Sequence, residues 1–209
     1  MSLILGFFDL LAYAIPGALY LTTFAYVAQR AGWIDVVSVL QVPSLLLIVV
    51  LAVAAFLTGQ AATPLGTLID RRNPFGSTGV PEQAKAEFLR RNADAAPRRF
   101  TEVDPYTLLA AIEVGDKEAA TDVTRLRSTA AMLSRSVPAL ALAALVAFAE
   151  AFTGSLPLFA VLTGIGLLLV AAGCLYQSVA FRKWVVIRTY ELCLWNDDID
   201  ARIPGRRDG

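Results

Sequence analysis

Apolar runs without any charged side chain set the organisation of this chain. Leu10–Gln29 contains twenty such residues, Val36–Ile69 thirty-four and Ala151–Phe181 thirty-one. Each run can hold a helix of the ~20 residues that cross the hydrocarbon core of a bilayer. A fourth run, Ser136–Ala149, has only fourteen residues, so a helix here spans the membrane only if it also includes Leu133–Val137.

We therefore predict an all-α integral membrane protein, a four-helix bundle with a helical cytoplasmic insertion between the second and third spans. The composition agrees, since 56% of residues are hydrophobic, 17% are charged and the mean hydropathy is +0.59. Because Met1–Leu11 carries no Lys or Arg, the first run is predicted to be a retained span and not a cleaved signal. The predicted spans are Phe7–Ala28, Val42–Ala62, Leu133–Phe152 and Pro157–Phe181.

Basic residues predict the orientation. Of the 18 Lys and Arg residues, seventeen lie in Arg71–Arg135 or Arg182–Arg207, and Arg30 is the exception. Cytoplasmic loops carry the excess of Lys and Arg. We therefore expect a multi-pass protein of the plasma membrane with both termini and the central segment in the cytoplasm. Fifteen Arg against three Lys is typical of a GC-rich bacterial genome, so this membrane would be a bacterial inner membrane.

The predicted domain boundaries follow from the spans. Residues 1–62 form the first hairpin, 63–132 the cytoplasmic insertion, 133–181 the second hairpin, and 182–209 an amphipathic cytoplasmic extension with a polar tail. Eleven basic residues in 71–135 are balanced by ten acidic residues in 70–122, which indicates a folded element and not a polybasic loop. The extension places aromatic and basic side chains where a bilayer interface favours them.

Helix start and stop signals predict three helices in the central segment. Pro81 opens one that runs through Arg91, and Asp104–Pro105 opens a second that ends at Gly115. Asp116 would cap a third helix that continues into the third span. Such a continuous helix would be a stiff rod between the cytoplasmic element and the membrane.

The residue types exclude several kinds of chemistry. The chain has no histidine and only two cysteines, which removes Ser-His and Cys-His nucleophiles and most zinc sites. We expect no cofactor, no metal and no disulfide. Asn196, Asp197, Asp198 and Asp200 could touch a hard cation, although a polar helix end is the favoured explanation of this cluster. The formal net charge of zero indicates no nucleic-acid surface.

Polar and aromatic residues are unusually dense in the first span. They suggest a kinked helix that lines a pore or ligand pocket, although the same residues also suit a plain bundle in which tyrosines pack on neighbouring helices. The candidate pore or pocket residues are Tyr13, Pro16, Gly17, Tyr20 and Thr23.

Small residues recur every fourth position in the third span. Such a stripe permits close approach of two helix backbones, either within the second hairpin or against another protomer. For the same reason, Gly164-Ile165-Gly166 in the fourth span indicates packing and not a dinucleotide loop. The candidate packing residues are Ala139, Ala143, Ala147, Ala151, Ala160 and Gly164.

Three ionisable residues lie at or near the hydrocarbon: Asp9, Arg135 and Glu150. A charge inside the membrane is expensive and often functional. Near an interface, however, a long side chain can instead reach the headgroups. Arg135 also precedes Pro138, where the rod could hinge.

These patterns predict a non-enzymatic membrane module. Its cytoplasmic element would bind a protein partner or signal, and the bundle would respond as an effector or a pore-like homo-oligomer in the lipid bilayer. An anchor or scaffold protein is an alternative. A small transporter or lipid-modifying enzyme is a second alternative, which the missing histidines and the missing internal repeat disfavour.

Overall fold

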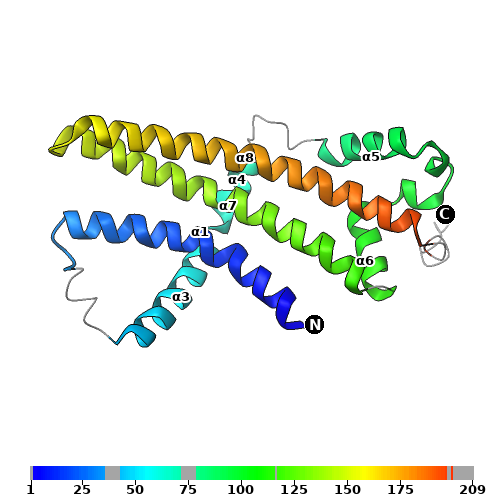
Figure 1. Ribbon diagram of the computed structural model, residues 1–209, viewed down its shortest axis with the longest axis horizontal. Coiled ribbons are helices and arrows are strands. Elements are labelled where there is room, and N and C mark those ends of the chain that lie inside the picture. Colours follow the sequence, from blue (N-terminus) through cyan, green and yellow to red (C-terminus); the bar gives the residue numbers. More distant parts are fainter. Residues whose placement is uncertain (1, 36–42, 72–78, 116, 197–198, 200–209) are drawn as a thin grey trace. The chain divides into compact units, whose positions relative to one another are not determined.

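A computed structural model describes residues 2–35, 43–71, 79–115, 117–196 and 199, with the backbone alone at 2–9, 70 and 71. Within these ranges every regular element is an α-helix or a 3-10 helix. Four of the α-helices are long and apolar enough to cross a membrane (Figure 1). They are α1 (Ser2–Arg30), α3 (Ser44–Ala61), α7 (Lys117–Thr153) and α8 (Pro157–Leu194). The all-α class and the four apolar helices are therefore confirmed.

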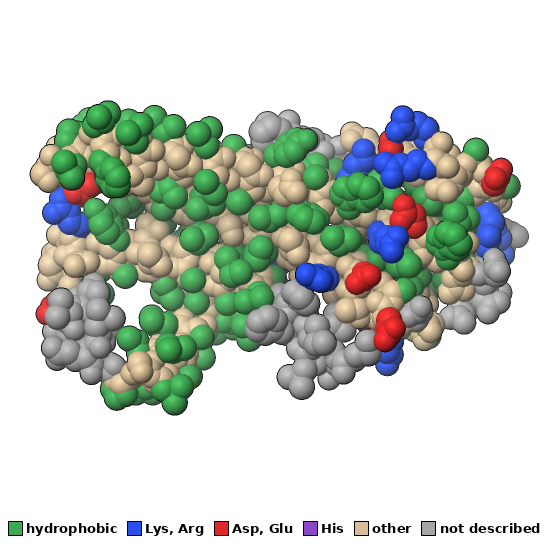
Figure 2. All heavy atoms as spheres, in the orientation of Figure 1, with side chains coloured by type: hydrophobic (Ala, Val, Ile, Leu, Met, Phe, Trp, Pro, Cys, Tyr) green, Lys and Arg blue, Asp and Glu red, His purple; other side chains and the backbone are tan. Residues whose placement is uncertain are grey.

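The chain forms two compact units. The first comprises residues 1–75 and 131–178, and the second comprises 76–130 and 179–209. Besides α1 and α3, the first unit holds α4 (Thr63–Arg71); the second holds α5 (Val80–Arg91), η1 (Ala93–Ala95), η2 (Arg99–Glu102) and α6 (Pro105–Gly115). Both α7 and α8 contribute residues to each unit. Exposed hydrophobic side chains cover the first unit, whereas charged side chains gather on the second (Figure 2).

The turn between α7 and α8 lies between the third and fourth predicted spans and depends on glycine. The N–H of Gly154 donates to the Glu150 carbonyl at 2.7 Å. A β-carbon on Gly154 would lie only 2.8 Å from that same carbonyl oxygen. Pro157 then begins α8, in the first helical turn, where a missing N–H costs nothing.

The helices of the second unit begin where the sequence predicts. Asp104 caps α6, since its Oδ2 accepts from the N–H groups of Tyr106 at 2.9 Å and Thr107 at 3.2 Å. In α5, Gly79 precedes the first turn with a φ of 87°, which glycine adopts without strain. Asp116, the predicted cap of α7, lies outside the described residues.

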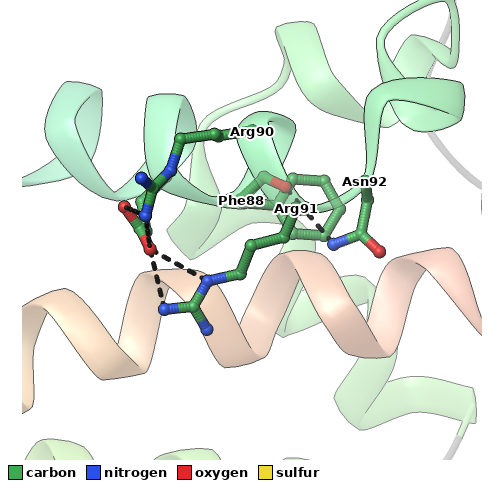
Figure 3. Close-up of polar contacts among 5 residues, drawn as sticks. Phe88, Arg90, Arg91 and Asn92 are labelled. Carbon is green, nitrogen blue, oxygen red and sulfur yellow. Dashed lines mark hydrogen bonds and ion pairs between the residues drawn. The ribbon is translucent and has the colours of Figure 1, made fainter.

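The last turn of α5 carries a polar network (Figure 3). Arg90 and Arg91 both donate to the Glu87 carboxylate, at 2.8 Å and 2.9 Å, and the Asn92 amide donates to the Phe88 carbonyl at 3.3 Å. The guanidinium donors lower the pKa of Glu87 below its usual value of 4.5. Basic residues in the last turn also complement the helix dipole.

An aromatic cluster fills the core of the second unit. Phe88 stacks on Tyr190 with ring centroids 5.4 Å apart, and Phe100 lies 6.3 Å from Phe88 and 6.4 Å from Tyr190. The residues of the C-terminal extension are part of this core: Val185, Val186, Ile187, Tyr190, Cys193 and Ile199 are all buried. The central segment and the extension, which are separate domains in the sequence-based prediction, thus form one core.

Candidate functional site

The candidate pore residues of α1 lie on or beside its buried face. Pro16, Gly17, Tyr20 and Thr23 are all buried, together with Ala12. Ala12, Pro16, Tyr20 and Thr23 follow one another at spacings of three or four residues, which places them along one side of the helix, and Gly17 adjoins Pro16. This side packs within the first unit.

Glycines let α1 and α3 touch at backbone level. A β-carbon on Gly17 would overlap the carbonyl oxygen of Ala55, and one on Gly59 would overlap the carbonyl oxygen of Tyr13. Gly59 and Ala55 are the buried residues of α3. Gly17, a candidate pore or pocket residue in the sequence, forms a helix crossing in the structure, and Gly59 completes this crossing from the other side.

The hydroxyl groups of α1 are used inside the helix. Thr22 and Thr23 donate to the carbonyls of Ala18 and Leu19, each at 2.8 Å. Tyr20 stacks on Phe24 at 6.5 Å, and its buried hydroxyl makes no hydrogen bond to any described residue. The threonines therefore offer no free donor to a ligand, and a pore or pocket along α1 stays a prediction.

Tyr13 contacts two other helices of the first unit, and its partner Arg135 lies against a third. The tyrosine ring meets Phe56 of α3 edge-on at 5.8 Å, and the Arg135 guanidinium of α7 lies 4.1 Å from the ring centroid. The Arg135 stem passes close to Gly66 of α4, where a β-carbon would lie 3.1 Å from Cγ. Arg135 thus makes a cation–π contact within the protein, an interaction worth about 0.5–2 kcal/mol.

Glu150 binds Arg30, the exceptional base of the sequence. The Arg30 guanidinium donates to both carboxylate oxygens, with 3.2 Å between Nε and Oε2. This bidentate pair ties the C-terminal end of α1 to that of α7. Sequence reasoning considered Glu150 and Arg30 separately, because residues 120 positions apart give no local signal.

A cavity of about 270 Å³ opens beside this ion pair within the first unit. Its walls are mostly apolar, and Glu150 is the acidic group among them. The lining residues are Tyr26, Ala147, Glu150, Phe159, Ala160 and Thr163. The structure thus brings together three residues that the sequence singled out, Ala147, Glu150 and Ala160.

The small-residue stripe of α7 is only partly buried. Ala139 is fully buried, whereas Ala143, Ala147 and Ala151 are half-buried. On α8, Ala160 and Gly164 are buried, and a β-carbon on Gly164 would lie 2.7 Å from the Phe148 ring. Gly164 therefore packs against an aromatic side chain that adjoins the alanine stripe.

Two other predicted sites cannot be compared with the structure, because the side chains of Asp9 and of Asp197, Asp198 and Asp200 lie outside the described residues. Among the residues that the structure does describe, no group of three or more acidic or cysteine side chains could hold a metal ion.

No protein-family model, curated protein or solved structure matches this chain.

Proposed function

We propose that this chain is a non-enzymatic, multi-pass protein of a bacterial plasma membrane. Its second unit is a cytoplasmic domain that binds a protein partner or signal. The first unit is the membrane bundle that responds, as an effector or a pore-like oligomer.

One observation supports the coupling of the two units above all. Helix α7 places Val123 in the core of the second unit and Leu140 in the apolar cluster of the first, and α8 does the same with Tyr190 and Leu175. An α-helix transmits rotation or translation along its hydrogen-bonded backbone. A partner that repacks one core would therefore shift side chains in the other.

The distribution of bases supports the proposed orientation. Arg30 is the one base outside the two basic segments, and its ion pair with Glu150 ties the end of α1 to the end of α7. The side that carries the turn at Gly154 therefore has a single base, whereas the two basic segments have seventeen. The positive-inside rule counts Lys and Arg, and it favours a cytoplasmic second unit.

The surface of α3 supports a bundle in contact with lipid or with a second copy. Leu45, Ile48 and Leu57 are each at least 60% exposed. A helix that is apolar on all sides and so little buried needs an apolar environment.

Photo-crosslinking tests partner binding. A photoreactive residue at Val114, which is 85% exposed on α6, should give a discrete adduct with one second protein in cells. The same residue at Leu158 of the first unit is the control. Absence of adducts at both Val114 and the exposed Tyr106 would contradict a partner of the cytoplasmic domain.

Ion flux tests the pore-like response. Purified protein in liposomes should form oligomers and conduct ions when the crosslinked partner is added. Tight liposomes with the partner present, together with a monomer in detergent, would contradict the pore.

A further inference from the structure

The cavity beside Glu150 joins an ion pair to apolar walls. Helices α1, α7 and α8 all contribute to it, and Tyr26 and Phe159 supply two aromatic rings while Ala147 and Ala160 supply small side chains. Its volume of about 270 Å³ lies just below the ~300–1,000 Å³ of pockets that enclose a drug-sized ligand. The cavity can therefore hold a small ligand or one part of a larger molecule.

The ion pair keeps hydrogen-bonding capacity for such a ligand. A guanidinium has five N–H donors and a carboxylate about four lone-pair sites, and Arg30 gives two donors to Glu150. Tyr26 can occupy one further site on each group. At least two donors of Arg30 and about one acceptor site of Glu150 remain. Both side chains are accessible, since 54% of Arg30 and 23% of Glu150 are exposed.

The charges of this site favour a ligand that carries both signs. Glu150 is the charged residue among those that line the cavity, and Arg30 balances it. A ligand with a net charge would add an unpaired charge at the edge of the hydrocarbon, which is costly. A molecule that carries one ammonium and one phosphate group leaves the sum at zero. Its ammonium can donate to Glu150, and its phosphate can accept from Arg30.

The predicted spans place the ion pair at the boundary of the hydrocarbon. Glu150 lies two residues before Phe152, the end of the third span. Arg30 lies two residues after Ala28, the end of the first span. Each is thus ~3 Å from the boundary, and Ala147 lies ~8 Å inside it, at ~1.5 Å per residue. The apolar side of the cavity therefore lies within the ~15 Å of hydrocarbon in one leaflet. This step rests on the proposed function, which takes these helices as membrane spans.

We propose that this cavity binds the headgroup of a zwitterionic phospholipid with a primary amine, the phosphatidylethanolamine class, in the leaflet at the Gly154 end. Glu150 accepts from the ammonium, and Arg30 donates to the phosphate. Ala147 and Phe159 contact the glycerol and the first methylene groups. A primary ammonium has three N–H donors, whereas the trimethylated nitrogen of choline has none, so the carboxylate selects the amine.

Lipid titration of the full-length protein in a non-ionic detergent tests the proposal. Native mass spectrometry with dioctanoyl phosphatidylethanolamine should show one saturable site. Binding should be about tenfold tighter than for dioctanoyl phosphatidylglycerol, dioctanoyl phosphatidylcholine or soluble glycerophosphoethanolamine, a difference of about 1.4 kcal/mol.

Two variants locate the site. The double variant Arg30→Gln/Glu150→Gln removes both charges and should weaken phosphatidylethanolamine binding about tenfold. The matched control is Arg188→Gln/Glu191→Gln, which removes an ion pair of similar exposure from the second unit and should bind like wild type.

Ala147→Leu keeps the ion pair but fills the cavity, and it should also weaken binding about tenfold. Its control is Ala172→Leu, the same change at an exposed position of α8 in the first unit, which should bind like wild type. This variant decides the question if the double variant does not fold.

Three results would overturn the proposal. Phosphatidylglycerol or phosphatidylcholine bound as tightly as phosphatidylethanolamine would show no selection of the amine. Glycerophosphoethanolamine bound as tightly as the lipid would indicate a soluble ligand. Unchanged binding by the double variant or by Ala147→Leu would exclude the ion pair or the cavity. None of these results bears on the coupling of the two units, because thiol labelling measures that coupling separately.

Discussion

Gly59 of α3 lies directly against the backbone of Tyr13 in α1: a β-carbon on Gly59 would come within 2.8 Å of the Tyr13 carbonyl carbon and would overlap its oxygen. The contact between Gly17 and Ala55 repeats this arrangement. The neighbours are backbone atoms, so no side chain can move aside to make room.

Gly59→Ala should therefore separate α1 from α3. We expect a loss of about 1–3 kcal/mol, the usual cost of overpacking, measured as a lower Tm in detergent. Gly173→Ala is the matched control, since a β-carbon there meets nothing within 4 Å and alanine favours a helix. Equal Tm values for both variants would show that the crossing is not tight.

The Arg30–Glu150 pair predicts rescue by charge exchange. Arg30→Glu and Glu150→Arg should each lower the Tm, because each places two like charges together at the ends of α1 and α7. The double variant restores opposite charges and should recover most of the loss. Additive losses in the double variant would mean that the pair does not stabilise the bundle.

The sequence predicted local features well and distant contacts poorly. The Asp104–Pro105 start and the Gly115 end of α6 are local signals, and both agree with the structure. Gly17 and Gly59 meet from different helices, and Arg30 meets Glu150 across 120 positions. Spacing along one helix cannot reveal such contacts.

Distant contacts also decide the environment of the extension after Phe181, which the sequence alone does not reveal. Its alternating apolar and charged residues suit a bilayer interface and a protein core equally, because both environments bury one face of a helix. The presence of Phe88 and Phe100 from elsewhere in the chain decides between them, since Tyr190 packs on both. Only the tertiary structure supplies those partners.

The hydrogen bonds of Glu87 with Arg90 and Arg91 should make the stability of the protein depend on pH. The pKa of Glu87 is lower in the folded protein than the usual 4.5, so the carboxylate stabilises the fold above the unfolded-state pKa. This contribution is lost as the pH falls through the folded-state pKa. Glu87→Gln should thus have a lower Tm than wild type at pH 7, and the difference should vanish in acid. Glu102→Gln makes the same charge change at an exposed position and serves as the control; a difference that persists in acid would exclude the ionised pair as its cause.

Cysteine labelling in cells tests the orientation. Ser155→Cys should react with a membrane-impermeant maleimide in intact spheroplasts, whereas Ala110→Cys should react only after lysis. Both positions are exposed, and Ser155 avoids the crowded backbone at Gly154. The two natural cysteines are replaced by alanine in this background. The reverse labelling pattern would invert the proposed topology.

Thiol reactivity in liposomes tests the coupling between the units most directly, because each unit carries its own cysteine. Cys174 is half-buried in the first unit, and Cys193 is buried in the core of the second. Phe88→Ala should loosen that second core by about 3–5 kcal/mol, while Trp195→Ala removes an exposed aromatic side chain as the control. With a membrane-permeant maleimide and peptide mapping, we expect Phe88→Ala to speed the labelling of both Cys193 and Cys174 several-fold, and Trp195→Ala to change neither. Faster labelling of Cys193 with no change at Cys174 would contradict the coupling and would favour a simple anchor.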